Sequence, residues 1–85
     1  MYHRVMPTIL RIRNYRFFFY SNELGEPPHI HVQSERKLAK FWLQPVQLAS
    51  STRFQAHELN KLNRLVEENR KRLPEAWHEY FGNSS

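Results

Sequence analysis

The chain has 85 residues and no cysteine, and 13 Lys and Arg residues against 8 acidic ones give it a formal net charge of +5. This length allows one small domain, and the lack of cysteine excludes disulfides and thiolate metal sites. The longest apolar run, Phe17 to Tyr20, is far too short to cross a bilayer, and no signal-peptide segment is visible, so we predict a cytoplasmic protein with no membrane partner.

The first half of the chain has the composition of a β-sheet. We predict a tail over residues 1–5, one domain over residues 6–82 and a second tail over residues 83–85. Aromatic and β-branched residues, separated by turn-forming residues, predict four strands at Ile9–Arg13, Tyr15–Tyr20, His29–Gln33 and Lys37–Leu43. Gln44 and Pro45 are expected to end the sheet, because proline cannot donate to the ladder of hydrogen bonds.

The second half has helical periodicity. Gln55, with Glu58 three residues later, is the expected N-cap of a long helix, and Thr52 is the alternative. Pro74 either begins a second, short helix or kinks the first one. An apolar stripe is formed by Leu59, Leu62, Leu65, Val66 and Leu73.

Strands followed by helices, with no alternation of the two, predict an α+β fold. The expected architecture is a four-stranded antiparallel meander followed by one long and one short C-terminal helix, both packed on one face of the sheet. The other face of such a sheet can stay open to solvent or to a ligand.

The segment from Pro27 to Val32 contains two histidines separated by one apolar residue. Successive side chains of a strand point to opposite faces, so His29 and His31 are expected to share a face, roughly 7 Å apart along the strand. Ile30 would then point into the core. Imidazoles titrate near neutral pH and bind metals, which makes the pair a candidate active site, although a plain polar surface is also compatible with the pattern.

Strand alternation predicts which side chains accompany the histidines. Lys40 is expected on the same face, and Arg16, Phe18 and Tyr20 are favoured over Phe17 and Phe19 as the outward set of the second strand. The predicted catalytic residues are His29, His31, Lys40, Arg16 and Tyr20. The predicted nucleic-acid-binding residues are Arg11, Arg13, Lys37 and Trp42.

This set of side chains is suited to cleaving RNA through its own 2′-hydroxyl. Such a reaction needs a base and an acid on two sides of the phosphate and a cation for the growing charge. Two strand histidines could supply the first pair, with Lys40 or Arg16 as the cation. A basic surface with aromatic rings also suits single-stranded RNA. The hypothesis is a metal-independent endoribonuclease without a cofactor.

Two alternatives remain open at this stage. The first is a non-catalytic module whose basic sheet face binds nucleic acid or an acidic protein. The second is a small metalloenzyme, because a His-x-His pair supplies two ligands. Glu26, His57 or His78 could complete such a site only if the fold brings them close, and the chain contains no aspartate.

Several segments together resemble the DUF4160 family of small bacterial proteins. The matching segments are Met6–Ile12, Tyr15–Glu23, Glu26–Val32, Ala39–Leu43, Pro45–Val46, Leu48–Ala49, Glu58–Leu59 and Ala76–Phe81. Genes of this family often lie beside one for a DUF2442 protein, an arrangement similar to a type II toxin–antitoxin module. The resemblance implies a toxin-like protein with a small DUF2442-like antitoxin as partner. The leading hypothesis is a toxin that acts on RNA or the translation machinery through His29 and His31, with an acidic antitoxin, and a homo-oligomer remains open.

The chain departs from the family pattern in its helical half. Members usually have a small capping residue where this chain has Gln55, and helix formers where it has Leu73 and Pro74. These departures leave the histidine segment unaffected, but they make the boundary between the two helices harder to predict.

Overall fold

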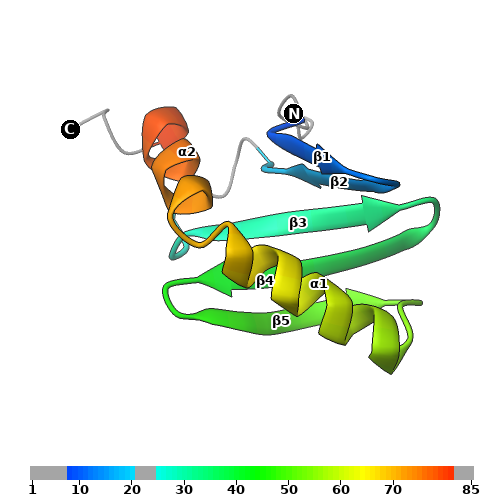
Figure 1. Cartoon of the computed structure of the whole chain (residues 1–85). Coiled ribbons are helices and arrows are strands. Elements are labelled where there is room, and N and C mark those ends of the chain that lie inside the picture. Colours follow the sequence, from blue (N-terminus) through cyan, green and yellow to red (C-terminus); the bar gives the residue numbers. More distant parts are fainter. Residues whose placement is uncertain (1–7, 21–24, 82–85) are drawn as a thin grey trace.

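The computed structural model describes residues 8–20 and 25–81, and it consists of one antiparallel sheet followed by two helices (Figure 1). The strands are β1 (Leu10–Ile12), β2 (Tyr15–Phe18), β3 (His29–Ser34), β4 (Lys37–Leu43) and β5 (Val46–Thr52). The helices are α1 (Ala56–Glu68) and α2 (Arg72–Phe81). The predicted tails over residues 1–5 and 83–85 lie outside the described residues.

The strands lie in sequence order, and each pairs antiparallel with the next. The predicted α+β meander with a long and a short helix is therefore confirmed. The sheet has five strands rather than the predicted four. Among the described residues, no helix combines the length and the apolar character needed to cross a bilayer.

The fifth strand corrects the prediction that Gln44 and Pro45 end the sheet. These two residues instead form the turn between β4 and β5. β5 is hard to predict because in its sequence, VQLASST, the alternation of apolar and polar positions stops after three residues and small, mostly polar residues follow. From Gln47 to Thr52 every residue is exposed, so packing imposes no pattern on this strand.

Helix α1 begins as predicted. Gln55 is the N-cap, and its backbone N–H donates to Glu58 Oε1 at 3.4 Å. Leu62 and Val66 of the predicted stripe are fully buried against the sheet. Figure 1 shows α1 crossing over β4 and β5, whereas α2 lies near the start of β3.

Helix α2 begins two residues before Pro74, so neither predicted role of this proline is correct. Pro74 occupies the third position of the helix. The N–H groups of the first helical turn have no partner within the helix, so a proline there removes no hydrogen bond. Residues 69–71 separate α2 from α1, which ends before the proline can kink it.

The core lies between the sheet and the helices. Alternate residues of the middle strands, Phe17, Ile30, Val32 and Phe41, have no exposed surface. They pack with buried side chains of α1 and α2 in one cluster, which includes Leu62, Val66, Leu73 and Trp77.

The core predicts a clear difference between a buried and an exposed position. Leu62→Ala should lower the free energy of unfolding by about 2–5 kcal/mol, because it leaves a cavity under α1. Lys71→Ala, at an exposed position between the two helices, should alter the free energy of unfolding by no more than about 0.5 kcal/mol. Urea unfolding of the two variants tests this, and equal midpoints would contradict the packing described.

Candidate functional site

The two histidines of β3 lie side by side on one face of the sheet, as the alternation predicts. Their ring centroids are 5.2 Å apart and the ring planes are nearly perpendicular. Across the ladder, His29 is opposite Trp42 and His31 is opposite Lys40 on β4, while Phe18 of β2 is opposite His31 on the other side.

The prediction that these rings are open to solvent is wrong. His29 has no exposed surface and His31 is 6% exposed. Trp77 of α2 packs against His29, with 4.8 Å between the ring centroids. The ring of His31 contacts two aromatic rings, Phe18 at 5.5 Å and Tyr20 at 4.6 Å. Aromatic side chains of the sheet and of α2 therefore cover the pair.

The buried ring of His29 is held by the loop that precedes β3. Its Nδ1 is 2.9 Å from the carbonyl oxygen of Pro27. A carbonyl only accepts hydrogen bonds, so Nδ1 carries the proton and donates it. The same nitrogen is 3.7 Å from Glu26 Oε1, and that oxygen accepts a hydrogen bond from Lys40 Nζ at 2.6 Å. Glu26 thus links a buried imidazole to a surface cation.

Arg16 lies on the same face and has neutral partners. Its Nη1 donates to Gln33 Oε1 at 2.7 Å and its Nε donates to Thr8 Oγ1 at 2.8 Å. The guanidinium carbon lies 4.4 Å from the centroid of the Phe18 ring. These contacts fix the side chain, but none of them brings a carboxylate to it, so its positive charge is not neutralised within the part of the chain described.

A second arginine accompanies Arg16. Arg11 of β1 is directly opposite Arg16 of β2, so the two share a face, and Arg11 is exposed. On β4, Lys40 Nζ lies 4.6 Å from the centroid of the Trp42 ring, which is half-buried. We call this side of the sheet the histidine face: Arg11, Arg16, Phe18, Tyr20, His29, His31, Gln33, Lys40 and Trp42.

Two predicted nucleic-acid-binding residues lie on the opposite side of the sheet. Arg13, in the turn after β1, borders a hollow of about 270 Å³ beside Tyr15 and Lys61 of α1. Lys37 donates to Glu58 Oε2 of α1 at 2.8 Å. Arg13 therefore does not extend the histidine face as expected, because the turn, in which its φ is +56°, takes it out of the alternation of β1. Lys37 shares the side of Ala39 and Phe41, which α1 covers.

The possible metal ligands are not gathered. Within residues 8–20 and 25–81, no group of three or more His, Cys, Asp or Glu side chains is placed to hold a metal ion. Glu26 lies beside His29, as the metal hypothesis required, but His57 and His78 are exposed on the two helices.

Two contacts of the site escape prediction from the sequence. Trp77 is recognisable as part of an apolar helix face, but its contact with His29 depends on where α2 docks. Glu26 lies three residues before His29, so its closeness to that histidine could be suspected. Its bond to Lys40 joins residues 14 positions apart and requires the β3–β4 pairing.

The sequence of this chain matches a known protein family. The model of a family described as "Domain of unknown function (DUF4160)" matches residues 14–78. No curated protein and no solved structure matches the chain.

The burial of the histidines predicts that they contribute to stability. His31→Ala should lower the free energy of unfolding by about 2–4 kcal/mol, because it removes a ring packed between Phe18 and Tyr20. His57→Ala, at an exposed position of α1, is the matched control and should change it little. Thermal or urea unfolding measures both, and an unaffected His31→Ala variant would contradict a packed role.

The ion pair between β4 and α1 predicts a dependence of stability on pH. The hydrogen bond from Lys37 lowers the pKa of Glu58 below its ordinary 4.5. The same bond raises the pKa of Lys37 above 10.5. The charged Glu58 side chain therefore makes its full contribution to the free energy of unfolding above its unfolded pKa. This contribution is lost as the pH falls through the lowered folded pKa. The contribution of the charged Lys37 side chain is lost only as the pH rises through its raised pKa.

The expected result is that Glu58→Gln is less stable than the parent at neutral pH, and that the difference disappears on acidification below pH 4.5. Urea unfolding across this pH range measures the difference. Glu79→Gln removes the same charge from an exposed position of α2 and serves as the control. A difference that persists in acid would show that the variant loses packing rather than charge.

Proposed function

This chain belongs to the DUF4160 family, and we propose that it is a toxin-like bacterial protein that binds single-stranded RNA through its histidine face. The family carries no assigned activity, so the proposal is supported by the side chains of this face and by the charge of the chain. We propose a cytoplasmic location and an action on RNA or on the RNA of the translation machinery.

The observation that carries the proposal is the pair formed by Arg11 and Arg16. Like charges on directly opposite residues of two strands destabilise a sheet. An anion bound between the two guanidinium groups would relieve this repulsion. Phosphate oxygens accept charge-assisted hydrogen bonds from arginine, and such contacts supply most of the sequence-independent affinity for nucleic acids.

Aromatic side chains next to the arginines favour a single strand over a duplex. The ring of Trp42 is half-buried, with the ammonium group of Lys40 near it, and Tyr20 is half-buried beside His31. Unstacked bases stack on aromatic rings, whereas the bases of a duplex are already stacked on each other. Arg16, Lys40 and Tyr20, first considered as catalytic residues, are thus assigned to binding.

The burial of the histidines favours binding over cleavage. A general acid or base must come within hydrogen-bond reach of the proton that it transfers. His29 has no exposed surface, and its Nδ1 proton is already donated to Pro27. We propose that His29 fixes the start of β3 and that His31 supports the Phe18 ring under Arg16.

The same face is suited to the antitoxin that the family resemblance implies. An acidic partner would be attracted to Arg11 and Arg16 by charge and would compete with RNA for them. The antitoxin would then neutralise this chain by covering its histidine face, and the fold of the chain would not need to change.

Binding is tested with a fluorescent oligouridine and two variants of equal net charge. Arg11→Ala should weaken binding about tenfold, because it removes a phosphate contact worth about 1.4 kcal/mol. Its slope of log affinity against log salt concentration should be smaller by about 0.7. Arg70→Ala, in the turn after α1, should leave both quantities close to those of the parent.

Two results would contradict the proposal. Equal weakening by Arg11→Ala and Arg70→Ala would show that only the overall charge attracts RNA. Cleavage of RNA by the parent, lost in a folded His31→Gln variant, would support the endoribonuclease instead. Expression in bacteria adds a cellular measurement: growth inhibition by the parent should be relieved by Arg11→Ala and not by Arg70→Ala.

A further inference from the structure

The sheet has two edge strands of different character. Within the described residues, β1 and β5 each have one strand neighbour, so their outer backbone N–H and C=O groups face no other strand. Figure 1 shows β5 along the lower rim of the sheet. Unpaired edges are templates for pairing with another chain, and natural proteins protect them with short length, charge or proline. β1 has three residues including Arg11, whereas β5 has seven.

β5 has little of this protection. Its sequence contains no charged residue and no proline, and the residues from Gln47 to Thr52 are exposed. One irregularity occurs in its ladder with β4, where Leu48 is opposite Phe41 and Ser50 is opposite Lys40, so that Ala49 has no opposite residue. Such a bulge bends a strand, but it leaves the outer backbone groups accessible.

Leu48 adds an apolar contact to this edge. It is 38% exposed and is the one large hydrophobic side chain with that degree of exposure among the described residues. Phe41, directly opposite, is fully buried in the core, so Leu48 lies on the side of the sheet that α1 covers. It therefore presents an exposed apolar side chain on the α1 side of this sheet edge.

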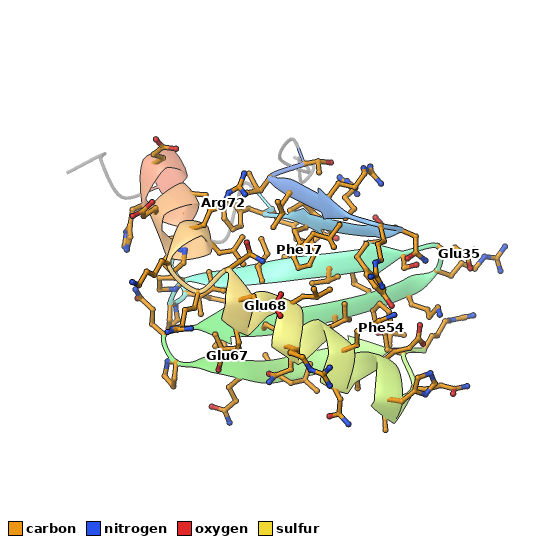
Figure 2. All side chains as sticks on the ribbon, in the orientation of Figure 1. Phe17, Glu35, Phe54, Glu67, Glu68 and Arg72 are labelled. Carbon is orange, nitrogen blue, oxygen red and sulfur yellow. The ribbon has the colours of Figure 1, made fainter. Side chains whose placement is uncertain are left out.

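The flank of α1 next to β5 is also poor in cations. Figure 2 shows Glu67 extending toward β5, whereas Glu68 lies toward the other flank, where it borders the hollow with Lys61. Asn60 and Asn63 precede Glu67 by seven and four residues, so they share its flank. The side of α1 that faces an incoming strand is thus mainly neutral and polar.

We infer that β5 pairs antiparallel with β5 of a second copy of this chain, about a two-fold axis close to Leu48. A partner selected by charge would be attracted to Arg11 and Arg16 rather than to β5. A neutral strand is instead matched by an equally neutral strand, and in a self-pair of VQLASST no charged side chain lies opposite another. Leu48 of each copy would be covered by the other copy.

This arrangement joins the two five-stranded sheets into one continuous sheet. Because the two-fold axis is perpendicular to the sheet, both α1 helices lie on one side and both histidine faces on the other. Two pairs of Arg11 and Arg16 then face the same direction. The inference goes beyond RNA binding and does not depend on it, because β5 shares no residue with the histidine face.

Light scattering coupled to gel filtration tests the inference on the whole chain. The parent should have the mass of two chains. Leu48→Lys and Leu48→Glu should each raise the dimer dissociation constant about 100-fold or more, because each brings like charges together near the axis. An equal mixture of the two variants should restore the dimer, since each lysine then meets a glutamate. His57→Lys adds charge at an exposed position of α1 and should leave the dimer intact.

Cross-linking gives a second measurement that does not depend on a charged substitution. The chain has no cysteine, so a Leu48→Cys variant should form an intermolecular disulfide under mild oxidation, whereas His57→Cys should not. A monomeric parent would overturn the inference, and so would a dimer that both charged Leu48 variants leave intact. Pairing of β5 only with a different protein would also overturn the inference. Weak RNA binding in a dimeric parent would contradict the proposed function alone.

Discussion

The central strand β3 is buried on both of its faces, and the other elements are arranged around this constraint. Ile30 and Val32 require an apolar cover on one side, which the two helices supply with Leu62, Val66 and Leu73. His29 requires cover on the other side that also accepts its proton. A buried polar group without a hydrogen bond is costly, and the carbonyl of Pro27 satisfies the Nδ1 of His29.

The two sides of the sheet also differ in how their cations are paired. On the side of the helices, the Lys37 ammonium is paired with Glu58. On the histidine face, Glu26 pairs with Lys40, but the contacts of Arg16 are all with neutral groups or a ring. On this face, the positive charges without a carboxylate partner among the described residues are therefore those of Arg16 and of Arg11 opposite it.

Burial of the histidine pair favours the proposed supporting role over a catalytic one. Two imidazoles on a solvent-exposed strand could exchange protons with a substrate. In this structure they are part of a layer of contacting rings, in which His31 stacks on Phe18 and Phe18 lies against the guanidinium of Arg16. Such a layer holds the arginine in place, which would lower the entropy lost in the proposed binding of a phosphate.

Properties that depend on local periodicity could be obtained from the sequence alone. Alternation placed His29 and His31 on one face with Arg16, and the Gln55–Glu58 spacing located the start of α1, because both patterns follow from the geometry of a single element. Only the tertiary structure decided which faces are covered. The docking of Trp77 on His29, the assignment of Arg13 and Lys37 to the α1 side, and the existence of β5 all depend on contacts between distant segments. β5 leaves no trace in local periodicity because it is held by backbone pairing with β4 rather than by burial of its own side chains.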